Sequence, residues 1–435
     1  MIGASPTDVG VVEAAERIRR GDWTSAGLVA ACLDRIDALE PSIQAWVHVD
    51  AWGALAEARE RDAAIADGRP VGPLHGVPIG IKDIIDVAEM PTRAGAAAFA
   101  HTMPTVDAPL VARLRDAGAV ILGKTHATQF AYRDPAPTRN PWSLGQTPGG
   151  SSSGSAAAVA ARMVPAAIGT QTVGSILRPA AYCGVVGCKG SFGTVPLEGV
   201  VPLSPALDHA GPIARSVADA ALLEGVLTGH PIELGPLDAP RIGVVRVLVE
   251  RAEPELGRHL ESLAGRLADA GARVADLELP SAFDGLADAG RVLLEAGAAT
   301  THEPWFAAHA ADYAPTIRDL VLAGQARSPG EVEAAERVRA AAREAWSGLA
   351  ATSDVLLTPV AVSSAPTLAE GTGDGSLCAP WSTLGVPAIA LPSGLDDAGL
   401  PFAVQLVGTA EEVGPLLGVA AWCEGVIGFE ARPSI

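Results

Sequence analysis

The densest run of glycine and serine in the chain is residues 148–155, with the sequence PGGSSSGS. Glycine lets a backbone turn sharply and approach a ligand closely, so such a run can present a reactive serine or wrap a phosphate. Residues 150–154 fit G-x-S-x-G, a pattern that places a nucleophilic serine on a sharp turn directly after a strand. The residues before it form a loop rich in proline and glycine, so the required strand is not predicted.

Two more interpretations of this run are open. Gly149 and Gly154 have the spacing of a phosphate-binding loop, G-x-x-x-x-G-K-[ST], but Ser155 stands where that loop requires lysine. The run is also suited to a turn that caps the alanine-rich helix expected at 155–163, because serine oxygens accept hydrogen bonds from the first N–H groups of a helix.

A further interpretation needs two other segments. Residues 169–180 read GTQTVGSILRPA, and residues 76–83 read GVPIGIKD. By itself, a lysine at a strand end is usually a solvated charge, and a serine after glycine is usually a turn residue. Taken together with residues 148–155, these segments resemble the amidase signature family of serine hydrolases. The resemblance implies a catalytic lysine, a serine that follows a cis peptide bond, and a nucleophilic serine.

The resemblance assigns these roles motif by motif. The GGSS match implies that Ser151 follows the cis peptide bond, and the family's spacing places the nucleophile 24 residues later, at Ser175. The G-[IV]-K-D match implies Lys82 as the lysine. The family's oxyanion hole then falls on the backbone N–H groups of Thr172, Val173, Gly174 and Ser175.

The chemistry of these residue types is consistent with the assignment. A serine hydroxyl is a weak nucleophile unless a neighbouring base takes its proton. Lysine acts as that base only when it is neutral, so its pKa of about 10.4 must fall, and burial lowers it by disfavouring the charged form. Lys82 lies in an apolar Pro/Gly/Ile strand. We therefore expect Ser151 to relay the proton of Ser175 to Lys82.

The sequence departs from the family's commonest pattern, T-D-x-G-G-S-I-R. Gln171 replaces Asp, Val173 replaces Gly, and Leu177 replaces Arg, with Arg178 one position later; Ser153 also replaces a Gly. The segment is similar to a T-Q-T-x-G-S-x-x-R-P subgroup of stand-alone bacterial amidases and urethanases, so the changes are coordinated. Neutral hydrogen bonds from Gln171 are expected to brace the loop. The β-branched Val173 restricts the backbone and is expected to narrow the site.

Other residue types that carry out chemistry have weaker support. A Ser-His-Asp mechanism requires a histidine beside Ser175, and the histidines in or near the matched segments are His75, His101, His126 and His209. The default interpretation is a core or loop histidine. The five cysteines are scattered, and no Cys/His cluster has zinc-ligand spacing, so we expect buried free thiols, no metal and no cofactor.

Composition limits the functional classes further. The 435 residues are 49% hydrophobic and 19% charged, which supports a large folded core. A net charge of −19 disfavours binding to nucleic acid or to an anionic membrane. No secretory signal and no membrane-spanning segment is predicted, so the expected location is the cytoplasm.

The pattern of elements predicts an α/β protein with one domain over residues 1–435. Residues 1–68 are expected to hold helices at 6–20, 25–39 and 51–66, and residues 70–215 alternate short apolar strands with helices, as in a catalytic core. Residues 280–330 look least regular and are a candidate substrate pocket or lid. The resemblance implies a central twisted mixed sheet sandwiched between helices.

The expected activity is hydrolysis of the C–N bond of small or aryl amides through a Ser175 acyl-enzyme, with carbamates (urethanes) and esters as further substrates. The reactants are then a small molecule and water, and the protein is a monomer or homodimer. The alternative is an amidotransferase A-like subunit that works in a tRNA-dependent complex. The irregular TQTVGS segment and the short 217–330 region fit that alternative poorly.

Overall fold

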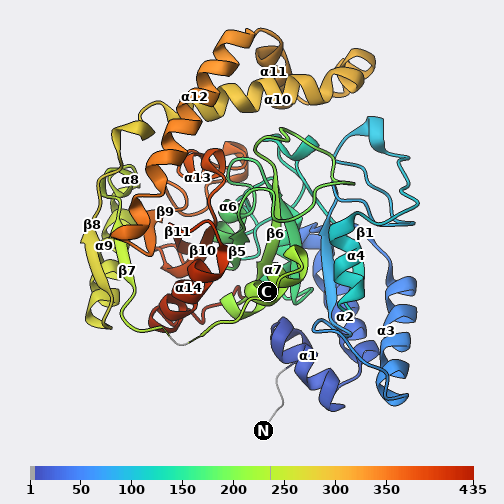
Figure 1. The fold of residues 1–435 in the computed structure, drawn as a ribbon. Coiled ribbons are helices and arrows are strands. Elements are labelled where there is room, and N and C mark those ends of the chain that lie inside the picture. The colour runs from blue at the N-terminus through green and yellow to red at the C-terminus, as the bar shows by residue number, and fades with distance from the viewer. Residues whose placement is uncertain (1–4, 236) are drawn as a thin grey trace.

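A mixed sheet of 11 strands is the centre of the computed structural model, which describes residues 5–235 and 237–435 (Figure 1). The first four residues of the expected N-terminal segment lie outside this range. The strand order is β1-β3-β2-β4-β6-β5-β10-β11-β9-β7-β8. The strands are β1 (Trp46–Val49), β2 (Pro78–Lys82), β3 (Val120–Thr125), β4 (Ala166–Gln171), β5 (Val186–Lys189), β6 (His209–Ala214), β7 (Arg241–Val244), β8 (Arg273–Asp276), β9 (Val355–Pro359), β10 (Ala388–Leu395) and β11 (Pro401–Gly408).

Helices cover both faces of this sheet (Figure 1). They are α1 (Val11–Arg20), α2 (Ser25–Ile43), α3 (Ala51–Ala66), α4 (Pro109–Asp116), α5 (Ser153–Ala160), α6 (Leu177–Cys183), α7 (Val217–Thr228), α8 (Arg246–Val249), α9 (Pro254–Asp269), α10 (Leu286–His309), α11 (Pro315–Gln325), α12 (Pro329–Trp346), α13 (Ala379–Leu384) and α14 (Val413–Ile427).

The residues of β10 show why the sheet needs cover on both sides. Ile389 and Leu391 belong to a hydrophobic cluster that includes α7, α9 and α14, whereas Ala388 and Ala390 belong to a second cluster that includes α6 and α13. Successive side chains of a strand point to opposite faces, so both faces are apolar here and both must be buried. The expected helix–sheet–helix sandwich is therefore confirmed.

Three neighbouring strands bring the motif segments together. β2 runs parallel to β3 on one side and to β4 on the other. The carboxyl ends of parallel strands meet at the same edge of a sheet, and ligand sites form there in α/β proteins. Lys82 is the last residue of β2, and Ser175 follows β4 after a short loop.

Residues 280–330 are more regular than the sequence indicates. They form α10 and α11, which lie against each other beyond one edge of the sheet, at the top of Figure 1. Two glycines of α10 lie within the regular helix and permit close packing. A Cβ on Gly290 would lie 2.2 Å from Oγ1 of Thr383, and one on Gly297 would lie 2.2 Å from Oγ of Ser204.

Several boundaries also differ from the expected ones. The helix expected at 155–163 is α5, which begins at Ser153 and ends at Ala160. The apolar stretch 242–247 is divided between two elements, because β7 ends at Val244 and α8 begins at Arg246. The N-terminal helical segment also contains a strand, β1, which pairs with β3. No helix among the described residues combines the length and apolar character needed to cross a bilayer.

Candidate active site

The amine of Lys82 lies at the centre of the motif segments. Its Nζ is 2.6 Å from Oγ of Ser151, 2.7 Å from Oγ1 of Thr170 and 3.3 Å from the Thr170 carbonyl oxygen. β2 and β4 are adjacent and parallel, so the end of β4 places Thr170 beside Lys82. Thr170 is a site residue that the sequence analysis did not identify, although it lies within the GTQTVGS motif.

Burial determines the charge of this amine. Lys82 is fully buried, as are the other four residues of β2. This burial lowers the pKa of Lys82 well below its ordinary value of 10.5, against the opposing effect of the negative charge of Asp208. Hydroxyl and carbonyl oxygens surround the amine, and no carboxylate lies within ion-pair distance of it among the described residues. The environment therefore favours the neutral amine, which is the form that accepts a proton.

The peptide bond between Gly150 and Ser151 is cis, the form that the resemblance implies. Hydrogen bonds to the carbonyl oxygens of Gly150 and Ser151 hold this segment in place. Nη2 of Arg178 donates to the Gly150 carbonyl oxygen at 2.8 Å, and the N–H of Thr128 donates to the Ser151 carbonyl oxygen at 3.2 Å. Arg178 is itself buried and lies in α6, three residues after Ser175. One side chain of α6 thus contacts the loop that carries Ser151.

The Gly/Ser run is a loop before α5 and does not follow a strand directly, so the G-x-S-x-G interpretation lacks its required context. The expected capping is also wrong. Ser152 is the N-cap residue of α5 and makes no side-chain capping bond. Its Oγ instead pairs with both the N–H and the carbonyl oxygen of Thr170, at 3.2 Å each. The side chain of Ser152 therefore connects the loop to β4.

The loop between β4 and α6 holds Ser175. The residue is close to the Gly/Ser run, because the N–H of Ser152 donates to the Ser175 carbonyl oxygen at 3.2 Å. Ser175 keeps 7% of its surface exposed. The backbone N–H groups of Val173, Gly174 and Ser175 find no acceptor within residues 5–235 and 237–435. Adjacent N–H groups without partners are the donors that a negatively charged oxygen requires.

Gln171 braces the loop between β4 and α6 by hydrogen bonds, as expected from the sequence. Its Oε1 accepts from the N–H groups of Ile176 at 2.9 Å and Leu177 at 3.0 Å, and its Nε2 donates to Oγ of Ser382 at 3.0 Å. Gln171 is fully buried, so each of these bonds offsets the cost of removing the amide from water. Ser382 lies in α13, and no sequence motif indicates its role.

A buried carboxylate supports the other side of the loop. Asp208 accepts from Oγ1 of Thr172 at 2.6 Å and from the N–H groups of Leu203 and Ser204 at 2.9 and 3.0 Å. Burial raises the pKa of Asp208, and these hydrogen bonds and the charge of Lys82 act in the opposite direction. The LDHAGP segment contains this residue, but its contact with Thr172 depends on the pairing of β4 with β6.

The histidines have other partners. Nδ1 of His209 lies 2.7 Å from the Leu207 carbonyl oxygen, and Nε2 of His75 lies 2.9 Å from the Arg61 carbonyl oxygen. Burial lowers the pKa of both rings. Among the described residues, Ser175 has no hydrogen bond to His75, His101, His126 or His209. This geometry favours the default interpretation of core and loop histidines. The five cysteines are buried free thiols.

A cavity of about 830 Å³ lies next to the Gly/Ser loop. One wall is residues 371–374, and Thr372 of this wall packs closely on Gly150, where an added Cβ would lie 2.8 Å from the Thr372 methyl carbon. The lining also includes Glu295 of α10 and Asp319 and Ala323 of α11. The 280–330 region therefore lines a cavity adjacent to the cis peptide bond.

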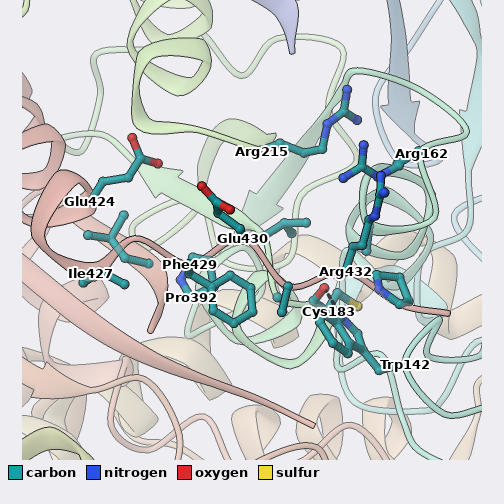
Figure 2. Close-up of a pocket in the computed structure, with 16 residues that line it drawn as sticks. Trp142, Arg162, Cys183, Arg215, Pro392, Glu424, Ile427, Phe429, Glu430 and Arg432 are labelled. Atoms are coloured by element: carbon teal, nitrogen blue, oxygen red, sulfur yellow. Dashed lines mark hydrogen bonds between the residues drawn. The ribbon is translucent and has the colours of Figure 1, made fainter. Parts of the chain in front are cut away.

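A second pocket, of about 150 Å³, is lined by other residues. Figure 2 shows Trp142, Phe429 and Arg432 around it. Lys82, Ser151 and Ser175 are part of the wall of neither this pocket nor the larger cavity. The candidate active site is therefore assigned from the motif residues and their hydrogen bonds.

A lysine kept neutral against a serine hydroxyl is characteristic of serine hydrolases that use lysine as the base. Comparison with known proteins defines the family. The chain belongs to the Amidase family, whose profile matches residues 27–412. It is an enzyme of that family, which acts on C–N bonds.

The most informative relatives fall into two groups. The A-type subunit of the glutamyl-tRNA(Gln) amidotransferase of Acidothermus cellulolyticus is 36% identical, over 91% of this chain and 90% of the relative. A solved structure described as an amidase has a TM-score of 0.90 and 35% identity, with 96% of this chain and 99% of that chain covered. The peptide amidase of Stenotrophomonas maltophilia has a TM-score of 0.83 and 32% identity, with 98% of both chains covered.

Proposed function

We propose that this enzyme hydrolyses the C–N bond of small or aryl amides through an acyl-enzyme on Ser175. The observation that carries the proposal is the fully buried Lys82 amine at 2.6 Å from Oγ of Ser151, with its pKa lowered by burial. A neutral amine in contact with a hydroxyl is a proton acceptor, and such an amine activates a hydroxyl nearby. Carbamates and esters present the same carbonyl and are further substrates of the same mechanism.

The proposed reaction has two acyl-transfer steps. Oγ of Ser175 attacks the substrate carbonyl carbon while its proton passes to Ser151, and the proton of Ser151 passes to Lys82. The C–N bond then breaks, and the leaving amine takes a proton back from the same relay. Water repeats the attack on the ester of Ser175, which releases the acid and restores the serine. In each of the two steps, the relay takes up one proton from the attacking hydroxyl and then returns one to the leaving group.

The negative oxygen of each tetrahedral intermediate requires hydrogen-bond donors. We assign these to the backbone N–H groups of Thr172, Val173, Gly174 and Ser175, because none of the four has an acceptor among the described residues. Loss of one such donor costs about 10²–10³ in kcat in a serine protease. The cavity walled by residues 371–374, α10 and α11 is assigned to the part of the substrate away from the scissile bond.

The test is a substrate screen with a covalent probe beside it. The purified chain is assayed on anilides, primary amides, carbamates and p-nitrophenyl esters, and is labelled with a fluorophosphonate. We expect turnover of at least one amide class and one labelled peptide that contains Ser175. The Ser175→Ala variant should lose both turnover and labelling. An acyl-enzyme in that variant, seen by mass spectrometry, would show that the nucleophile is another residue.

A second candidate function is favoured by the relatives. Several are A-type subunits of glutamyl-tRNA(Gln) amidotransferases, at 33–36% identity, that cover more than 90% of this chain. Such a subunit needs a complex, whereas an amidase acts alone. The two are separated by assaying the isolated chain without tRNA or ATP. Ammonia release from glutamine only in the presence of a co-purified partner would favour the amidotransferase, and turnover of an anilide by the isolated chain favours the amidase.

A further inference from the structure

Ser382 lies at the back of the nucleophile loop, in the short helix α13. Its Oγ donates to the Val173 carbonyl oxygen at 2.7 Å and accepts from Nε2 of Gln171 at 3.0 Å. The side chain is buried, so water does not compete for these bonds. Ser382 therefore joins the strand end at Gln171 to the middle of the loop through one hydroxyl.

The direction of each bond in this chain is determined by its partners. A carbonyl oxygen only accepts, so the single hydroxyl proton of Ser382 must go to Val173. Oε1 of Gln171 already accepts two backbone N–H groups, so the NH₂ end of this amide must face Ser382. The hydrogen bonds between Gln171, Ser382 and Val173 therefore have one possible arrangement of protons. Each polar atom that takes part has a hydrogen-bond partner.

This arrangement determines where the Gly174 N–H points. The Val173 carbonyl and the Gly174 N–H belong to one planar peptide group, in which C=O and N–H point in opposite directions when the bond is trans. Because the Ser382 hydroxyl holds the Val173 carbonyl oxygen on the side of α13, the Gly174 N–H must point to the side of the loop away from α13. Glycine has the widest range of backbone conformations, so Gly174 needs such an external support more than any other residue type would.

Packing beside α13 also restricts the position of the loop at Gly174. Cys378 immediately precedes α13, and a Cβ on Gly174 would lie 3.0 Å from the Cβ of Cys378. Both contacts place α13 behind the peptide groups whose N–H bonds are unsatisfied. We propose that Ser382 is a positioning residue that orients the Gly174 N–H as an oxyanion donor, through the hydrogen-bonded chain Gln171–Ser382–Val173.

The role rests on the proposed function, because it requires Ser175 to be the nucleophile. It goes beyond the family's motifs, since Ser382 is more than 200 residues away from Gln171 in the sequence. Removing the hydroxyl leaves the Val173 carbonyl and the Gln171 NH₂ without partners, and the loop is free to rotate the Gly174 peptide. A small misplacement of a catalytic group costs about 10²-fold in rate. We expect Ser382→Ala to lower kcat about 10- to 100-fold with little change in KM.

The experiment measures the second-order rate constant for fluorophosphonate labelling of Ser175, together with kcat and KM for the best amide of the screen. The matched control is Thr383→Val, one residue further along α13, whose hydroxyl bonds to the carbonyl oxygen of Ala379 in its own helix. We expect slow labelling and low kcat in Ser382→Ala and near wild-type values in Thr383→Val. The pH dependence of the rate should keep its wild-type midpoint, because Lys82 is not touched.

Two more variants keep the test decisive. If Ser382→Ala does not fold, Ser382→Cys replaces it, since a thiol has similar size and donates only weakly. The pair Gln171→Ala and Ser382→Ala should be strongly non-additive, because both break the same chain. Equal labelling rates in wild type, Ser382→Ala and Thr383→Val would overturn the role of Ser382 and leave the nucleophile intact. Absence of labelling in the wild type would instead refute the proposed function, and this role with it.

Discussion

Lys82 is the residue on which the proposed chemistry depends most. Its amine is fully buried, in contact with two hydroxyl groups, and its pKa is lowered well below 10.5 by that burial. Below its pKa the amine is protonated and cannot accept a proton, and above it the amine is a base. The rate must therefore rise with pH through this titration and then level off.

We predict that kcat/KM and the labelling rate of Ser175 both fall on the acidic side, with the midpoint belonging to the coupled Lys82–Ser151–Ser175 unit of the free enzyme. Lys82→Arg should be inactive at every pH, since arginine stays charged in proteins. The measurement is a pH profile of both rates, with EDTA as a control that should leave them unchanged. A profile that stays flat as far down as the protein remains folded would contradict a lysine base.

Val173 has two possible roles that an experiment can separate. Its side chain either shapes the substrate pocket or supports the loop near Gly375. Its Cγ1 lies 3.4 Å from the position that a Cβ on Gly375 would have, so the side chain packs toward the loop after residue 371. We predict that Val173→Gly shifts selectivity toward bulky substrates, because a steric wall is removed while the loop also loosens. Truncating such a contact typically changes discrimination by about 10- to 200-fold.

The measurement for Val173 is the ratio of kcat/KM for a small acetanilide and a bulky anilide, before and after substitution. A changed ratio supports a role in the substrate pocket. If the ratio stays constant while both rates fall, Val173 only supports the loop through its contact near Gly375.

At the scale of elements, the strand order brings the site residues together, and the helices α10 and α11 line the space beside them. The parallel ends of β2 and β4 bring Lys82 to Thr170, and α13 supports the nucleophile loop from behind. α10 and α11 contribute a wall of the 830 Å³ cavity. Rates for large substrates should therefore respond to this wall, while the reactivity of Ser175 itself should not.

We predict that Ala323→Trp, in α11, raises KM for bulky anilides about tenfold or more and leaves the labelling rate of Ser175 by a small fluorophosphonate near the wild-type value. The physical reason is that an indole fills space that a large substrate requires, whereas the relay and the N–H donors are unchanged. The control is Leu322→Trp, at a neighbouring position that is 48% exposed and is not part of the wall. Equal effects of the two substitutions on KM would argue against this cavity as the substrate pocket.

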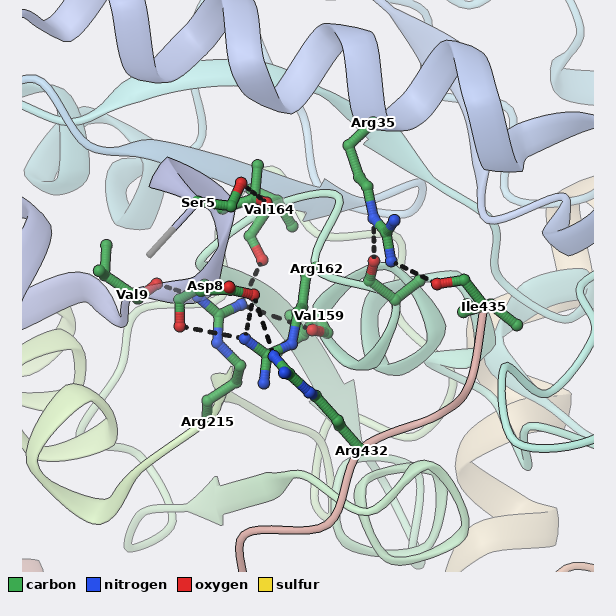
Figure 3. A network of polar contacts seen from close by, with 12 residues as sticks. Ser5, Asp8, Val9, Arg35, Val159, Arg162, Val164, Arg215, Arg432 and Ile435 are labelled. Atoms are coloured by element: carbon green, nitrogen blue, oxygen red, sulfur yellow. Dashed lines mark hydrogen bonds and ion pairs between the residues drawn. The ribbon is translucent and has the colours of Figure 1, made fainter. Parts of the chain in front are cut away.

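At the scale of the whole molecule, ionic contacts connect distant parts of the chain. Asp8, near the N-terminus, pairs with Arg162 at 2.6 Å and with Arg432 at 3.5 Å (Figure 3). Figure 3 also shows Arg215 reaching the carbonyl oxygens of Val9 and Val164 from the other side. This cluster joins Asp8 to the C-terminal tail, and within residues 5–235 and 237–435 its side chains make no hydrogen bond to the motif segments 76–83 or 169–180.

We predict that Asp8→Ala costs about 1 kcal/mol of unfolding free energy or less, because the carboxylate is partly exposed and such pairs are screened by solvent. The melting temperature should fall by about 2 °C or less, and the labelling rate of Ser175 should not change. Asp67→Ala, whose partner Arg69 is also exposed, serves as the reference substitution. A large loss of labelling at unchanged stability would show that the termini are coupled to the active site.

From the sequence alone, the resemblance to a known family was enough to predict the site residues that stand in short motifs. Lys82, Ser151 and Ser175 stand in motifs of a few residues, and the alternation of short strands with helices indicates a sheet covered on both sides. Local backbone preference and side-chain periodicity are properties of such windows, so they can be read before folding. The expectation of irregular structure at residues 280–330 was wrong, since Gly290 and Gly297 lie within a regular helix, where they allow close packing.

Only the tertiary structure decided which side chains meet across the chain. Thr170 contacts Lys82 because β4 pairs with β2, and Ser382 reaches Val173 because α13 packs behind the loop. The pKa of Lys82 likewise depends on the burial that the surrounding layers impose. Hydrogen bonds and desolvation act over a few ångströms in space, whatever the distance along the chain. Their pattern is set by strand order and helix packing, which no short window of this sequence contains.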